Sequence, residues 1–225
     1  MMLFVKKPSA FLLQFFLWLI SFFAIIWLWD NWYLPGPHGL YRWVGMDFAS
    51  YWVGVRGAFT GSDPYGFETT LKIQELVYGG PALGEDPMLF SYPAWLFIII
   101  VPFALLPYQW ASILWVSILL WAVLNLLLKI GIVLGGNRFR NQLLWILGLF
   151  VGSLPFLSIS VIKGQLGILG LLSLFFSYRF FKQKPGLSGV ILCIALKKPT
   201  VTVAPLVVFF MCDLYKKNIR FIFSF

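Results

Sequence analysis

The sequence predicts an all-α, polytopic membrane protein, in which several helices cross the bilayer. Of its 225 residues, 60% are hydrophobic and only 11% are charged. Because a soluble domain must cover its surface mostly with polar residues, this composition is poorly suited to water. Apolar runs also recur at about 20 residues, the length that a helix needs to cross a hydrocarbon core about 30 Å thick. One long polar loop, near the N-terminus, interrupts them.

The distribution of basic residues indicates a membrane topology rather than a nucleic-acid site. The formal net charge of +9 comes from 17 Lys and Arg residues and eight Asp and Glu residues. The basic residues are scattered between apolar runs, without the continuous stripe that follows a phosphate backbone. Loops that carry Lys and Arg on the cytoplasmic side explain this distribution better. We expect membrane lipids as partners and no nucleic acid.

The apolar runs define the predicted spans in order. The first, 10–29, follows Lys6 and Lys7; it is too long for a signal peptide and no small-residue cleavage site follows, so we expect it to be retained. Residues 30–90 form the long loop, and 91–107 is a shorter apolar segment with three prolines. The five further spans expected within 109–215 are 109–134, 142–160, 165–181, 186–198 and 200–215. The whole chain is predicted to form a single membrane domain.

Charge decides how the segment 91–107 is placed. If it does not cross, the loops that contain Arg138, Arg140, Arg179, Lys182, Lys184, Lys216, Lys217 and Arg220 are cytoplasmic. Downstream of this segment, only Lys163, Lys197 and Lys198 then lie outside, in agreement with the usual bias. If the segment crosses, the bias is inverted. We therefore expect 91–107 to be re-entrant or interfacial, the N-terminus to be cytoplasmic, and the loop 30–90 to be extracytoplasmic.

The loop contains two predicted juxtamembrane helices. Large apolar residues recur at helical spacing after Asp47, at Phe48, Tyr51, Trp52, Val55 and Phe59. This pattern predicts an amphipathic helix of about three turns along the membrane surface. Turn-forming residues follow at 61–66, and a second short helix is expected near 67–78, before the break at Gly79, Gly80 and Pro81.

Three polar groups fall on the extracytoplasmic face in this topology: Asp47, the segment from Lys163 to Gln165, and the segment from Lys197 to Pro199. Each has an ordinary structural interpretation. Asp47 is suited to N-cap the following helix, the second segment reads as a polar turn, and the third as an interfacial anchor. Together they suit a reaction on a lipid-linked phosphate, in which cations bind the phosphate and a carboxylate removes a proton.

An ordered set of motifs runs along the chain: Asp47-Phe48-x-x-Tyr51, Gly61-x-Asp63-Pro64-Tyr65, Phe90-x-Tyr92-Pro93, Pro102-x-x-x-Leu106-Pro107, Gly164-Gln165 and Lys198-Pro199. This set resembles glycosyltransferase family 87, a family of the GT-C superfamily that includes polyprenol-phosphate-mannose-dependent mannosyltransferases. The resemblance runs from about residue 40 to about residue 210. It implies a GT-C-like helical bundle with a long first extracytoplasmic loop.

The resemblance also implies roles for individual residues. Asp47 would be the general base of a transfer that inverts the anomeric carbon of a hexose. The hexose would be mannose-like. Lys198, Lys163 and Arg56 would contact the donor phosphate, and Gln165 the sugar or phosphate. Asp63, Tyr65, Tyr92 and Pro93 are expected to shape the loop. The donor would be a polyprenyl-phosphate sugar and the acceptor a lipid or glycan, with no metal and no cofactor required.

Members of this family are usually much longer, so we expect the chain to correspond to an N-terminal half that lacks later site residues. Two other functions stay open at this level. One is a transporter or flippase for a lipid-linked sugar, although no internal repeat is visible. The other is a non-catalytic membrane scaffold. The sequence specifies neither the sugar, nor the acceptor, nor the oligomeric state.

Overall fold

The computed structural model describes residues 8–36, 38–84, 87–94, 96–181, 183–195 and 207. The described chain is mostly helical and divides into two compact units, 1–165 and 166–225. The predicted span 200–215 lies outside the described residues except for residue 207, and so does the end of the predicted span 186–198.

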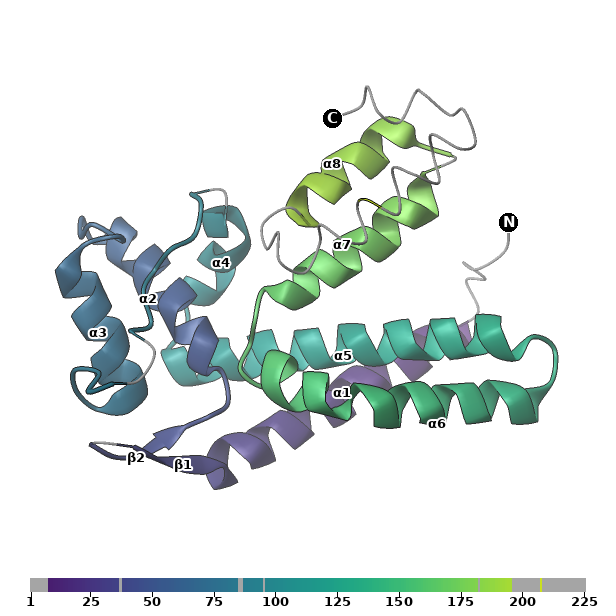
Figure 1. Cartoon of the computed structure of the whole chain (residues 1–225), viewed down its shortest axis with the longest axis horizontal. Coiled ribbons are helices and arrows are strands. Elements are labelled where there is room, and N and C mark those ends of the chain that lie inside the picture. Colours follow the sequence, from purple (N-terminus) through teal and green to yellow (C-terminus); the bar gives the residue numbers. More distant parts are fainter. Residues whose placement is uncertain are drawn as a thin grey trace. The chain divides into compact units, whose positions relative to one another are not determined.

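The first unit contains six α-helices, one hairpin and one π-helical turn in its described residues (Figure 1). In chain order they are α1 Pro8–Asn31, β1 Tyr33–Gly36, β2 Gly39–Arg42, α2 Met46–Phe59, α3 Phe67–Tyr78, α4 Leu96–Ala104, α5 Tyr108–Gly135, α6 Phe139–Phe156 and η1 Leu157–Val161. In the second unit, the described elements are α7 Gly167–Phe180 and α8 Pro185–Ala195.

Within the described residues, two helices are long and apolar enough to cross a membrane, at Leu12–Asn31 and Tyr108–Gly135. A core helix of a soluble protein is also apolar, but neighbouring elements cover it. Here only 17% of the most apolar window of α1 and 33% of that of α5 are buried inside the protein. The third long helix, α6, has no buried residue along its 18 residues. These uncovered apolar surfaces favour a membrane environment.

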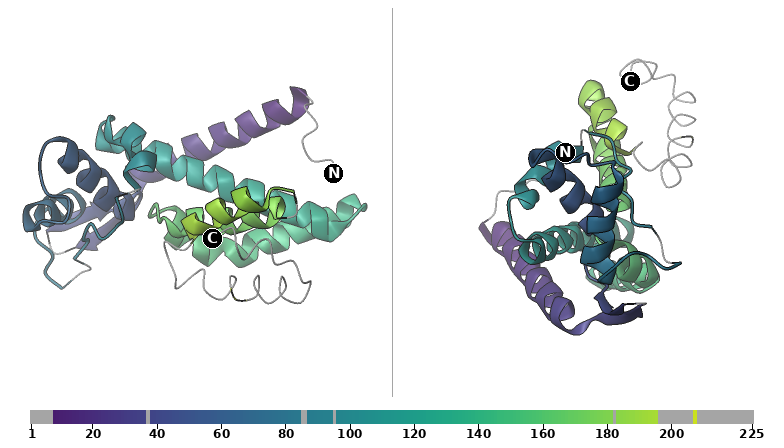
Figure 2. Two further views of the ribbon diagram at one scale, coloured as in Figure 1. Left: turned by 90° about the horizontal axis from the view of Figure 1, so that it is seen from above. Right: turned by 90° about the vertical axis from the view of Figure 1, so that its left-hand side faces the viewer.

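The long helices carry the loop region, residues 33–104, at one end (Figures 1 and 2). Helix α5 packs against both α1 and α6, and α2 packs against α3, α4 and α5. The predicted helix near 67–78 is confirmed as α3. The all-α prediction misses the hairpin, in which β1 and β2 pair antiparallel with Tyr33 opposite Arg42. Strands of four residues are too short to show a clear alternation of apolar and polar positions.

The helix predicted after Asp47 is confirmed as α2, but its predicted one-sided, amphipathic character is wrong. Buried residues surround much of the helix, and they include the small residues Ala49, Ser50 and Gly54. At Gly54 a Cβ atom would fall 2.3 Å from the ring of Phe90, so the absence of a side chain lets this ring approach the helix. The predicted apolar stripe contains only large residues. It therefore does not include the buried face that the small residues form.

Helix α4 occupies part of the segment 91–107. It has nine residues, with Pro102 inside it, and packs against α2 and α5. At 1.5 Å per residue such a helix is about 13 Å long, which is well short of a hydrocarbon core of about 30 Å.

In the second unit, α7 and α8 pack along each other. Two buried serines join them through reciprocal hydrogen bonds. Ser188 Oγ donates to the Ser177 carbonyl oxygen at 2.7 Å, and Ser177 Oγ lies 3.0 Å from the Ser188 carbonyl oxygen. Because buried polar groups are costly without partners, this exchange satisfies both hydroxyl groups and fixes the register of the helix pair.

Candidate active site

The start of α2 is attached to a turn far away in the sequence. Gly45, with φ of 71°, immediately precedes the helix, and its backbone N–H donates to the Ile162 carbonyl oxygen at 2.8 Å. Two residues later, the Asp47 N–H donates to the Lys163 carbonyl oxygen at 2.9 Å. These two bonds use N–H groups that a helix start leaves without intrahelical partners. They place the turn 162–165 directly against the candidate base.

Asp47 is not the N-cap of α2, contrary to its ordinary structural interpretation. The helix begins at Met46 and its N-cap is Gly45, which has no side chain to cap with. Asp47 therefore lies in the first turn, half-buried. The positive end of the helix dipole favours a negative charge at this position.

The turn that contains Lys163 and Gln165 rests on aromatic side chains. Gly164 has φ of 80°, and a Cβ atom there would lie 3.1 Å from Phe48 Cβ and from Trp115 Cδ1. Trp115 Nε1 donates to the Gly164 carbonyl oxygen at 2.9 Å, in a buried hydrogen bond. Lys163 and Gln165 themselves are half-buried. Only glycine combines this φ with such a close approach to its neighbours.

Trp43 fixes the cationic end of Lys163. The Lys163 Nζ lies 4.0 Å from the centroid of the Trp43 ring, a cation–π geometry. Sequence reasoning missed Trp43, because no sequence pattern around a loop tryptophan indicates which residue it contacts. The structure thus gives Lys163 a defined side-chain position as well as a fixed backbone.

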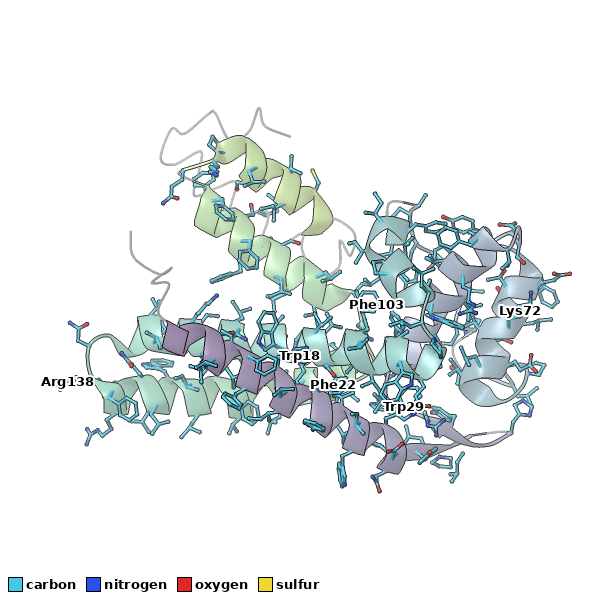
Figure 3. All side chains as sticks on the ribbon, turned by 180° about the vertical axis from the view of Figure 1, so that it is seen from behind. Trp18, Phe22, Trp29, Lys72, Phe103 and Arg138 are labelled. Atoms are coloured by element: carbon cyan, nitrogen blue, oxygen red, sulfur yellow. The ribbon has the colours of Figure 1, made fainter. Side chains whose placement is uncertain are left out.

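An aromatic cluster supports both segments. Phe48 is fully buried and stacks on Trp115, with ring centroids 5.4 Å apart, and it contacts Phe103 edge-on at 6.1 Å. Tyr108 stacks on Phe48 at 6.5 Å, and its hydroxyl donates to the Gly45 carbonyl oxygen at 3.0 Å. Figure 3 labels Phe103 on α4, near this end of the long helices. Each aromatic pair contributes about 0.5–1.5 kcal/mol beyond burial, so the start of α2 is rigidly held.

Arg42 is a second residue that sequence reasoning missed. Its guanidinium lies 5.0 Å from the Trp29 ring centroid and 5.1 Å from that of Tyr33, and it donates to the Tyr33 hydroxyl at 2.8 Å. The Trp29 ring in turn contacts the Tyr108 ring at 5.7 Å. The hairpin register, which pairs Arg42 with Tyr33, creates this position, and no short motif predicts it.

The structure does not bring Arg56 to Asp47. Arg56 lies nine residues further along α2, which corresponds to about 13 Å of helix rise. Its guanidinium stacks on Trp52 at 4.8 Å, and its Nη1 donates to the Ala104 carbonyl oxygen at 3.3 Å. Arg56 therefore belongs to the opposite end of α2. Lys198 lies outside the described residues.

The residues predicted to shape the loop hold its turns together. The Asp63 carboxylate accepts a hydrogen bond from the Tyr65 N–H at 2.9 Å, and the Tyr65 hydroxyl donates to the Tyr92 carbonyl oxygen at 2.7 Å. The Pro93 carbonyl oxygen accepts from the Leu96 N–H at 3.0 Å, where α4 begins. These contacts lie within the turns of the loop, and the architectural role of the four residues stays a prediction.

The described residues thus define a mostly helical protein that has two helices long enough to cross a membrane and a polar turn fixed beside a carboxylate. Comparison with protein families matches the description "Glycosyltransferase family 87" over residues 90–224, which is more than half of the chain. The chain belongs to glycosyltransferase family 87, as the sequence motifs indicate. This membership supports a glycosyltransferase activity. Comparisons with curated proteins and with solved structures found no match.

The matched region contains Lys163, Gln165 and Lys198 but begins after Asp47 and Arg56. The family match therefore does not assign the candidate base. What connects Asp47 to the matched region is the structure, through the hydrogen bond from its backbone N–H to Lys163.

Proposed function

We propose that this protein is an inverting glycosyltransferase that moves a mannose-like hexose from a polyprenyl-phosphate sugar to a lipid or glycan acceptor at the extracytoplasmic membrane face. One observation carries the proposal. The turn with Lys163 and Gln165, which lies within the family match, is hydrogen-bonded to the first turn of α2, where Asp47 lies. A carboxylate and a cation thus lie in two segments that are fixed to each other.

The proposed topology follows from helix lengths. Helix α1 takes the chain from the cytoplasm to the loop region, and α4 is too short to return it. Helix α5 then crosses inward and α6 outward, which puts the turn 162–165 on the same side as Asp47. Figure 3 shows Arg138 at the end of the long helices that lies far from Lys72 of the loop region. Arg138 would then face the cytoplasm, in agreement with the positive-inside rule.

The proposed reaction assigns a role to each group. The Asp47 carboxylate takes the proton from the acceptor hydroxyl, whose oxygen attacks the anomeric carbon of the donor sugar. The bond between that carbon and the phosphate oxygen breaks, the electron pair leaves with the polyprenyl phosphate, and the anomeric configuration inverts. Lys163, held over Trp43, binds the negatively charged phosphate of the donor, together with Lys198. Gln165 binds sugar hydroxyls or the phosphate.

The test supplies labelled polyprenyl-phosphate mannose to membranes that contain the parent chain or the Asp47→Asn variant. Removal of a general base is expected to lower transfer about 10²- to 10⁴-fold. Asp30→Asn is the matched control, because Asp30 is exposed at the end of α1 and should leave transfer unchanged. Undiminished transfer by Asp47→Asn would eliminate Asp47 as the base.

The same assay addresses the other functions. If neither parent nor variant transfers sugar, the enzyme proposal fails and the scaffold interpretation is favoured. If the parent moves labelled donor across sealed vesicles without forming a glycosylated product, the chain is a transporter. Only Asp47-dependent formation of product agrees with the proposal.

A further inference from the structure

A pocket of about 390 Å³ lies between α2 and α3, at the end of α2 opposite to Asp47. This volume falls within the range of small-ligand sites. Its walls include the cations Arg56 and Lys72, the carboxylate of Glu75, the hydroxyl of Ser62, and the apolar surfaces of Trp52 and Leu76. Asp47, Lys163 and Gln165 do not line it. It is therefore a site separate from the one around Asp47.

The two cations of this pocket differ in how firmly they are held. The Arg56 guanidinium is fixed by the Trp52 ring at 4.8 Å and by the hydrogen bond from its Nη1 to the Ala104 carbonyl oxygen. Lys72, by contrast, makes no hydrogen bond or ion pair with any described residue, although Glu75 follows one turn later in α3. A planar, fixed guanidinium and an ammonium group without a partner among the described residues are together well suited to bind a phosphate.

Exposed apolar side chains beside the pocket favour a membrane lipid as the source of this phosphate. Phe59 is 62% exposed and Phe67 is 75% exposed, and these two residues flank the turn whose Thr60 and Ser62 line the pocket. Apolar side chains next to exposed cations are typical of surfaces that insert at the level of lipid head groups. A site for a freely soluble anion has no need of them.

We propose that this pocket binds the phosphate-bearing head group of an anionic membrane lipid. Arg56 and Lys72 contact the phosphate diester, and Glu75 and Ser62 accept hydrogen bonds from hydroxyl groups of the head group. Phe59 and Phe67 lie among the acyl chains. Because Glu75 repels a second negative charge, the pocket prefers a singly charged, hydroxylated head group such as phosphatidylglycerol. The site does not depend on the proposed glycosyl transfer, so each proposal can fail alone.

The test measures lipid binding to the full chain, purified in a neutral detergent, by native mass spectrometry. The probes are dioctanoyl phosphatidylglycerol, dioctanoyl phosphatidylcholine and inorganic phosphate. The parent chain is expected to bind phosphatidylglycerol several-fold more tightly than phosphatidylcholine. Millimolar inorganic phosphate should not displace the lipid; complete displacement would identify a site for soluble anions and overturn the proposal.

Three variants locate the binding. Arg56→Gln should weaken phosphatidylglycerol binding about tenfold, and Lys72→Gln about threefold because its charge is exposed. Arg138→Gln is the matched control, since Arg138 is also exposed but lies at the other end of the long helices (Figure 3). Lys72 carries no contact that folding requires, so its variant tests the site even if Arg56→Gln is unstable. Equal losses in Lys72→Gln and Arg138→Gln, or no loss in Lys72→Gln, would overturn the proposal.

Discussion

The two ends of helix α2 are built in opposite ways. At its start, Gly45 and Asp47 donate backbone hydrogen bonds to a distant turn, and Phe48 is fully buried among aromatic rings. At its end, Arg56 and Phe59 are exposed, and Arg56 lines a pocket. One helix therefore carries a buried, rigidly held site at its start and an accessible site at its end.

This difference matches what the two proposed tasks require. A general base must be held close to its productive geometry, because small displacements of reacting groups are costly in rate. A head-group site only has to retain a flexible ligand, for which exposed cations are sufficient. Paired substitutions, one at each end of α2, test whether the contrast is real.

The largest effect is expected from the two phenylalanines of α2. Phe48→Ala removes a fully buried ring that contacts Trp115, Phe103 and Tyr108, and should cost about 3–5 kcal/mol of stability. Phe59→Ala removes a ring that is 62% exposed and should change stability by less than about 0.5 kcal/mol in detergent. Thermal unfolding of both variants, followed by circular dichroism, measures the difference. Similar losses would show that the two ends are not built differently.

Two glycines with the same backbone angle give the next effect. Gly164 and Gly61 both have φ of 80°, so alanine introduces the same left-handed strain at each, of about 1 kcal/mol. At Gly164, however, the new Cβ also lies 3.1 Å from Phe48 Cβ, whereas at Gly61 nothing lies within 4 Å. Overpacking should therefore add about 1–3 kcal/mol to the cost of Gly164→Ala alone.

The measurement for this pair combines unfolding with transfer activity. Gly164→Ala is expected to lower the unfolding temperature more than Gly61→Ala does, and to lower sugar transfer as well, because it displaces the turn beside Asp47. Gly61→Ala should retain full transfer. If both variants unfold at the same temperature, the turn yields easily and the start of α2 is less rigid than its contacts imply.

Sequence patterns were sufficient for the parts of the fold that local rules determine. The bounds of α3 could be predicted because turn residues precede it and Gly79, with φ of 79°, ends it. The position of α2 followed from its apolar spacing. Its burial on several sides did not, because Ala49, Ser50 and Gly54 contribute to packing only once neighbouring segments are placed against them.

The candidate site was predictable only in part, for a related reason. The sequence marked Asp47 and Lys163 by residue type, and charge bias suggested that both face the same side of the membrane. Trp43 and Arg42 could not be found, because their contacts depend on the hairpin and on the return of α6 to the start of α2. The sequence places Arg56 nine residues after Asp47 in the predicted helix. Its hydrogen bond to the Ala104 carbonyl oxygen could not be predicted, because that contact depends on how α4 packs against α2.

The smallest effect concerns the two tryptophans that hold the cations. Trp43→Leu removes the ring under Lys163, and Trp52→Leu removes the ring under Arg56. A cation–π contact at a partly exposed site contributes about 0.5–1 kcal/mol, so Trp43→Leu should raise KM for the lipid-linked donor about two- to fivefold and leave kcat nearly unchanged. Trp52→Leu should leave that KM unchanged and weaken phosphatidylglycerol binding instead.

Steady-state kinetics with varied donor concentration separates a positioning role of Trp43 from a merely structural one. A loss of folded protein lowers the apparent kcat and leaves KM unchanged, whereas a misplaced Lys163 changes KM. Trp43→Phe retains an aromatic face under Lys163 and should restore most of the donor affinity. If Trp43→Leu lowers kcat with an unchanged KM, or if Trp52→Leu raises the donor KM equally, Trp43 does not position the cation for the donor phosphate. The two cations would then not separate donor binding at the start of α2 from head-group binding at its end, even if the two ends differ in aromatic packing.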